Sequence, residues 1–91
     1  MKISVELSLY PLGNEDPIAE IVAFIDDVRA DARLEVAINQ MSTQITGELE
    51  DVMAVLSAAM QRSFAGEGTR VLVAKFLSKA QPINQPPVLE R

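Results

Sequence analysis

The middle of the chain contains the segment Met41-Ser42-Thr43-Gln44-Ile45-Thr46-Gly47-Glu48, in which hydroxyl and amide side chains crowd a predicted central β-strand. A central strand is normally apolar or β-branched unless its polar side chains have partners. Ser8 and Tyr10 end an earlier alternating strand, just before Pro11-Leu12-Gly13. If the two strands are neighbours, uncharged hydrogen-bonding groups lie side by side on one sheet surface. This suits the binding of a small polar ring better than bond-breaking chemistry.

Upstream of this segment, the pattern predicts a strand and then a helix. Residues 2–10 alternate between polar and apolar side chains, which is typical of a strand with one buried face. Pro11 and Gly13 are expected to end this strand. Asp16 is suited to cap a helix that begins at Pro17, and apolar side chains at helical spacing extend this helix to about residue 31.

Around and after the segment, the pattern repeats. Residues 34–39 and 41–47 predict two strands joined by a tight turn. Residues 49–64 carry a second helical stripe, with Met53 and Met60 expected in the core, and residues 70–77 predict a fourth strand. The order βαββαβ indicates an α+β, ferredoxin-like sandwich with a four-stranded antiparallel sheet in the order 4-1-3-2 and two helices on one face.

Domain limits follow from composition. Residues 1–78 form the predicted ferredoxin-like domain, and residues 79–91 form a proline-rich tail with little periodicity. The tail is expected either to be a mobile extension or to pack on a neighbouring subunit through Ile83, Val88 and Leu89.

The residue types exclude several classes of site. The chain has no cysteine and no histidine, so it cannot form disulfides, thiolate metal sites, or Ser-His and Cys-His nucleophile pairs. The net charge of −5 disfavours nucleic acid. The chain contains no membrane-length apolar run, and its N-terminus does not resemble a secretory signal. We therefore predict a cytoplasmic protein with no metal, no cofactor and no catalytic residue.

The sheet face without helices is polar but sparsely charged, which suggests that another subunit covers much of it. We expect a homo-oligomer, a dimer or tetramer, associated through this face. Its hydroxyls could equally satisfy one another across that interface without any ligand. An enzyme that uses Tyr10 or Glu6 as acid or base is a third alternative.

Three short motifs resemble the thiamine-binding proteins of the YkoF and UPF0045 type: Ser8-Leu9-Tyr10-Pro11-Leu12-Gly13, then Met41-Ser42-Thr43 with Gly47-Glu48, then Gly68-Thr69-Arg70-Val71. The likeness extends from about Ile3 to Leu77. Related sequences can have a glutamate before the glycine, where this chain has Thr46 and places Glu48 after it. The location of an anionic group in the site is therefore open.

The resemblance implies a ferredoxin-like fold and non-enzymatic binding of thiamine or its hydroxymethylpyrimidine part, by a carrier or sensor in thiamine supply. Serine, threonine and asparagine can pair with the acceptors and the donor of an aminopyrimidine, and Glu6 or Glu48 could favour a thiazolium cation. The alternative is a structural or regulatory oligomerisation module. The predicted ligand-binding residues are Ser8, Tyr10, Asn39, Met41, Ser42, Thr43, Gln44 and Glu48.

Overall fold

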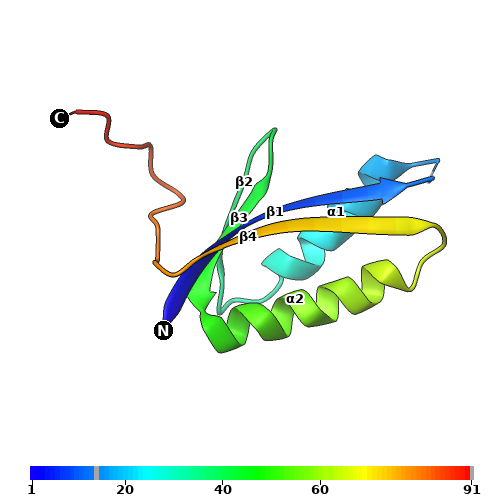
Figure 1. Ribbon diagram of the computed structural model, residues 1–91, viewed down its shortest axis with the longest axis horizontal. Coiled ribbons are helices and arrows are strands. Elements are labelled where there is room, and N and C mark those ends of the chain that lie inside the picture. Colours follow the sequence, from blue (N-terminus) through cyan, green and yellow to red (C-terminus); the bar gives the residue numbers. More distant parts are fainter. Residues whose placement is uncertain (14, 91) are drawn as a thin grey trace.

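The computed structural model describes residues 1–13 and 15–90 and confirms the predicted order of elements (Figure 1). Arg91, the last residue of the predicted tail, lies outside the described residues. Neither helix in the described part of the chain is long and apolar enough to cross a membrane. The elements are β1 (Lys2–Leu12), α1 (Pro17–Arg29), β2 (Glu35–Ile38), β3 (Thr43–Glu48), α2 (Leu49–Phe64) and β4 (Thr69–Leu77).

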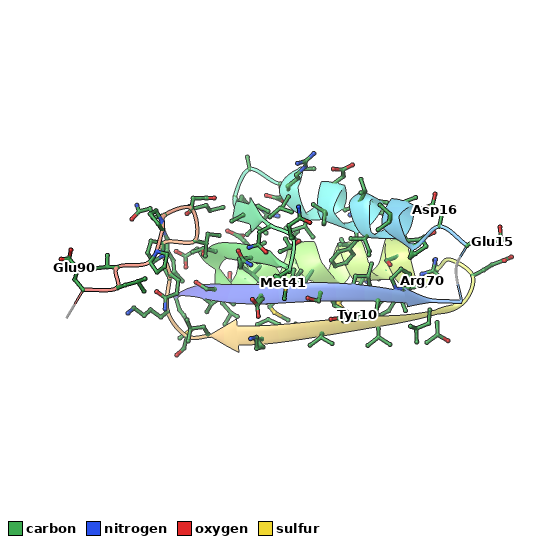
Figure 2. All side chains as sticks on the ribbon, turned by 90° about the horizontal axis from the view of Figure 1, so that it is seen from above. Tyr10, Glu15, Asp16, Met41, Arg70 and Glu90 are labelled. Atoms are coloured by element: carbon green, nitrogen blue, oxygen red, sulfur yellow. The ribbon has the colours of Figure 1, made fainter. Side chains whose placement is uncertain are left out.

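The four strands form one antiparallel sheet in the order β2-β3-β1-β4, which is the predicted order counted from the opposite edge. Figure 2 shows both helices on the same side of β1 and β4. The α+β, ferredoxin-like sandwich is therefore confirmed. We call the other side of the sheet the open face.

The core lies between the sheet and the two helices. β1 contributes the alternating residues Ile3, Val5, Leu7 and Leu9, and β3 contributes Ile45 at the centre. Gly47 lies where β3 passes close to Leu34, just before β2. A Cβ at Gly47 would lie 2.7 Å from Leu34 Cδ2, so this glycine allows a close approach.

The apolar stripe of α2 was predicted only in part. Val52, Val55, Leu56 and Ala59 are the buried residues of α2, whereas Met53 is 46% exposed. The prediction of a core Met53 is therefore wrong. The reason is that α2 faces the sheet with Val52, Val55, Leu56 and Ala59, so Met53 lies at the border of this face, beside β4.

β1 continues past the predicted break and runs through Pro11 to Leu12. Its pairing with β3 ends at Leu7↔Thr43, whereas its pairing with β4 extends to Leu12↔Thr69. Proline is tolerated at a free strand edge because a missing N–H costs no ladder hydrogen bond on that side. β1 therefore has a free edge from Ser8 onward.

The first part of the tail, residues 79–84, lies across the open face. Ser4 Oγ donates to the Lys79 carbonyl and accepts from the Gln81 N–H, both at 2.8 Å. Thr46 Oγ1 donates to the Gln81 carbonyl at 3.4 Å, and Asn84 Nδ2 donates to Glu35 Oε1 at 2.7 Å. The tail thus passes over β1 and β3 and reaches β2.

Candidate functional site

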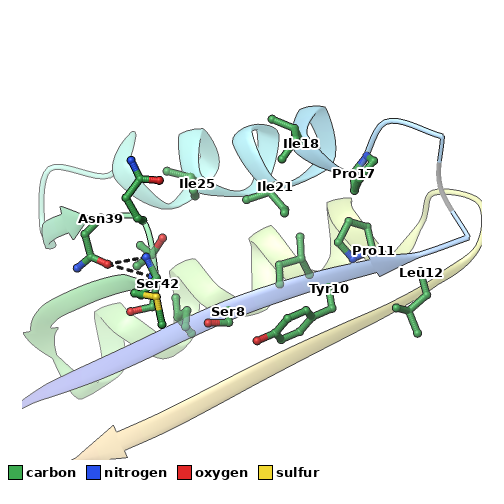
Figure 3. Close-up of a pocket in the computed structure, with 15 residues that line it drawn as sticks. Ser8, Tyr10, Pro11, Leu12, Pro17, Ile18, Ile21, Ile25, Asn39 and Ser42 are labelled. Carbon is green, nitrogen blue, oxygen red and sulfur yellow. Dashed lines mark hydrogen bonds between the residues drawn. The ribbon is translucent and has the colours of Figure 1, made fainter.

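The free edge of β1 forms one wall of a pocket with a volume of about 450 Å³. The opposite wall is α1, and the turn between β2 and β3 closes one end (Figure 3). We call this cavity the edge pocket. Its lining residues are Leu7, Ser8, Leu9, Tyr10, Pro11, Leu12, Pro17, Ile18, Ile21, Ile25, Asn39, Gln40, Met41, Ser42 and Thr43.

Asn39 shapes the turn that closes the edge pocket. Its side-chain Oδ1 accepts from the backbone N–H groups of Met41 at 2.9 Å and Ser42 at 3.1 Å, shown as dashed lines in Figure 3. The Asn39 N–H also donates to the Ser42 carbonyl at 3.1 Å. Such turns, closed by an asparagine side chain, are a common local structure. Asn39 therefore holds the backbone of residues 40–42 in place beside the pocket.

Hydroxyl groups on the sheet divide into two sets. On the open face, Ser4 and Thr46 share a hydrogen bond of 3.3 Å and also bond the tail. In the edge pocket, the hydroxyls of Ser8, Tyr10 and Thr43 make no hydrogen bond to any described residue. Thr43 as a whole residue is only 7% exposed, so most of its surface is covered by protein while its hydroxyl lines the pocket. The pocket therefore offers polar groups whose partners are not supplied by the surrounding protein.

The remaining wall of the edge pocket is apolar and comes from α1. Ile18, Ile21 and Ile25 lie at helical spacing along the side of α1 that faces β1, as Figure 3 shows. The sequence predicted these residues only as part of the apolar stripe of a helix, not as part of a site. The buried residues of α1 are Phe24 and Val28, and Ile18 is 67% exposed. In the sequence, the apolar residues of α1 occupy more than one face of the helix, and this width could have indicated a second apolar surface.

Six of the eight predicted ligand-binding residues line the edge pocket, namely Ser8, Tyr10, Asn39, Met41, Ser42 and Thr43. The structure places the other two elsewhere. Gln44 lies on the open face, where its Nε2 donates to Ser42 Oγ at 2.6 Å. Glu48 pairs with Lys2 at the opposite end of β3 from Thr43, and its carboxylate accepts from the N-terminal amine at 2.9 Å.

Glu6 is the carboxylate linked to the pocket through a lining residue. Its Oε2 accepts from Ser42 Oγ at 3.0 Å, and its Oε1 pairs with Lys75 Nζ at 2.7 Å. Hydrogen bonds from Lys75 and then Ser42 lower the pKa of Glu6, so this group is ionised at neutral pH. The same pairing raises the pKa of Lys75.

Fold and pocket together define a small ferredoxin-like domain with a concave site beside a free strand edge. This site is partly apolar and partly lined by uncharged hydrogen-bonding groups. Sites of this shape and size are typical of small-molecule binding. A family model described as thiamine-binding protein matches residues 5–75. The chain belongs to the thiamine-binding protein family, as its motifs predicted. No curated protein matches the chain.

Solved structures with the same fold come from distant organisms. A protein from Streptococcus pneumoniae is 22% identical, with a TM-score of 0.79 over 87% of this chain and 88% of its own. A Thermotoga maritima protein, named for thiamine biosynthesis or salvage, is 16% identical, with a TM-score of 0.77 over 87% and 85%. A protein from Methanocaldococcus jannascii is 21% identical, with a TM-score of 0.74 over 92% and 87%. All three structures therefore share their fold with this chain over 87–92% of its length.

Proposed function

We propose that this protein binds thiamine, or its hydroxymethylpyrimidine part, in the edge pocket without chemical turnover. The main observation behind this proposal concerns a cavity of about 450 Å³, which is lined by the hydroxyls of Ser8, Tyr10 and Thr43. None of these hydroxyls has a hydrogen-bond partner among the described residues. Its volume lies within the range of small-ligand pockets. Family membership supports the choice of ligand.

The polar end of the pocket suits an aminopyrimidine. This ring presents acceptor nitrogens beside an amino donor, and a hydroxyl can donate to one and accept from the other. Ser8 and Thr43 supply such hydroxyls from the two faces of the sheet at the point where the pairing of β1 with β3 ends, because Thr43 lies opposite Leu7 and Ser8 is the next residue of β1. The isoleucines of α1 would cover the ring face opposite the strand. Analogues without the amino group would leave these hydroxyls unpaired and bind weakly.

The proposed role is that of a carrier or sensor in thiamine supply, and a cytoplasmic location remains a prediction from the sequence. Glu6, ionised and hydrogen-bonded to Ser42, is the proposed source of negative charge for the thiazolium ring. Glu48 has no part in this proposal, because it lies at the other end of β3.

Self-association through the open face is a second part of the proposal. Tyr10, Val71 and Val73 are 51%, 40% and 50% exposed on this face, and they are close together because Tyr10 pairs with Val71 and Ser8 pairs with Val73. Such a patch is typical of a subunit interface. An oligomerisation module with no ligand is the competing function, favoured by the internal pairing of Ser4 with Thr46.

The direct test is isothermal titration calorimetry with thiamine and, separately, with hydroxymethylpyrimidine. We expect saturable binding of at least one of them, with one site per chain. A pyrimidine without the amino group serves as the matched ligand control and should bind at least tenfold more weakly. No heat and no thermal shift with either ligand at millimolar concentration would leave the oligomerisation module as the better function.

A further inference from the structure

A second apolar concavity lies on the helix side of the sheet, between α2 and β4, with a volume of about 580 Å³. We call it the α2–β4 groove. Met53, Met60 and Phe64 line one wall, and Leu72 and Phe76 line the other. Phe64 and Phe76 are 44% and 54% exposed. The α2–β4 groove lies along the edge strand β4, whereas the edge pocket lies on the other side of β1, between α1 and the β2–β3 turn.

The end of the tail presents matching apolar side chains. Val88 and Leu89 are 86% and 82% exposed, and they follow Pro86-Pro87. Figure 1 shows the last residues of the tail extending away from the sheet and from both helices. A Pro-Pro segment favours the extended polyproline conformation, which loses little entropy when it docks against aromatic side chains.

The route of the tail prevents it from reaching the groove of its own chain. The hydrogen bonds from Gln81 to Ser4 and from Asn84 to Glu35 direct it across the open face toward β2, the edge farthest from β4. The six described residues after Asn84 extend about 20 Å at most. To reach the groove of its own chain, the tail would have to cross about 14 Å of sheet width from β2 to β4 and then about 10 Å to the helix side.

We propose that the α2–β4 groove binds residues 86–89 of a second copy of this chain, and that two copies exchange their tails. The lengths agree: α2 spans about 16 Å between Met53 and Phe64, and a four-residue polyproline segment spans about 12 Å. Reciprocal exchange closes into a two-fold dimer, which limits growth to a defined oligomer. This interface is distinct from the open face and does not depend on the identity of the ligand.

Disulfide cross-linking provides a sharp test because the natural chain has no cysteine. A Leu89→Cys chain is mixed under oxidising conditions with a Met53→Cys chain and, separately, with a Val22→Cys chain. Met53 and Val22 are 46% and 48% exposed, but Val22 lies on α1, outside the groove. We expect the mixed disulfide with Met53→Cys to form at least tenfold faster. Equal rates, or no mixed disulfide, would overturn the proposal.

Two further measurements complete the test. A chain that lacks residues 85–91, checked for folding by circular dichroism, should have half the native mass of the full chain. An unchanged mass would contradict tail exchange. In the Met53→Cys/Leu89→Cys double variant, the disulfide should join two chains. A disulfide within single chains would show that the tail reaches its own groove, and would also overturn the proposal.

Discussion

At the scale of single residues, the hydroxyl groups of serine and threonine have different hydrogen-bond partners according to their position on the sheet. Ser4 and Thr46 bond each other and the tail, and Ser42 donates to Glu6. Thr43, three residues before Thr46 in the same strand, has no hydrogen-bond partner in the described structure and faces the edge pocket. This contrast makes Thr43 the most informative position to change.

Replacing Thr43 with valine removes the free hydroxyl and keeps the shape of the side chain. We expect Thr43→Val to weaken ligand binding by about 1–3 kcal/mol, because a polar group of the ligand is left unpaired in the pocket. Calorimetric titration measures this change. Thr46→Val makes the same substitution in the same strand outside the pocket and should leave the affinity unchanged. Equal affinities for wild type and Thr43→Val would show that Thr43 is structural.

Glu6 should distinguish the charged ligand from the neutral one. Glu6→Gln keeps an acceptor for Ser42 and removes the negative charge that is maintained by Lys75 and Ser42. We expect thiamine to bind about two- to fivefold more weakly and hydroxymethylpyrimidine to bind as before, since only thiamine carries the cationic ring. Glu48→Gln is the matched control, and its titrations should equal those of the wild type. Equal losses for both ligands would argue against an electrostatic role.

At the scale of elements, the connection from α1 to β2 is held by one guanidinium and two carboxylates. The Arg33 Nη2 donates to Asp31 Oδ2 at 2.7 Å, and the Arg33 Nη1 donates to Asp51 Oδ1 on α2 at 3.0 Å. The hydrogen bonds from Arg33 lower the pKa of Asp31 from 3.8 to about 2. These contacts join the loop to the first turn of α2.

The lowered pKa of Asp31 predicts an acid dependence of stability. Because the folded pKa lies below the unfolded value, ionised Asp31 stabilises the fold above about pH 4, and this contribution is lost as the pH falls toward 2. Asp31→Asn should therefore lower the melting temperature at pH 7 and flatten its dependence on pH between 4 and 2. Asp26→Asn matches the change in net charge and should keep the wild-type slope. Thermal melts at several pH values measure both.

At the scale of the whole molecule, two apolar surfaces lie on opposite sides of the domain. The patch of Tyr10, Val71 and Val73 is on the open face, and the α2–β4 groove is on the helix side. The tail connects these sides only through another subunit, because its root is bonded to Ser4 and Glu35. An assembly that uses both surfaces would be a tetramer built from two kinds of dimer.

A charge on the open face tests the first of these surfaces. Val73→Lys would bury a cation in a face-to-face interface, so the native mass at micromolar concentration should fall by half. Sedimentation analysis measures this mass. Val22→Lys adds the same charge to α1 at a similar exposure and should leave the mass unchanged. A wild-type mass equal to one chain would remove the need for either interface.

Periodicity predicted each helix and strand to within a few residues, because alternation in β1 and the stripes of both helices reflect burial directly. The polar segment 41–48 predicted a binding site, and six of the eight named residues line one pocket, although only Thr43 of them belongs to β3. That these residues bind a ligand stays a prediction. Two details were predicted wrongly. Pro11 continues β1 because it pairs with Arg70 of β4, and Met53 lies beside β4 instead of in the core; both outcomes depend on contacts with residues distant in the chain.

The sequence by itself determined the strand and helix order, the sheet order and the polar character of β3, since these depend on side chains a few residues apart and on general rules of chain connection. Only the tertiary structure decided which hydroxyls are left free, which carboxylate lies beside the pocket, and where the tail runs. Those outcomes depend on register and on the unequal lengths of β1 and β3, which bring together residues distant in the chain. A shift of one residue in that register would exchange the side chains of the pocket for those of the core.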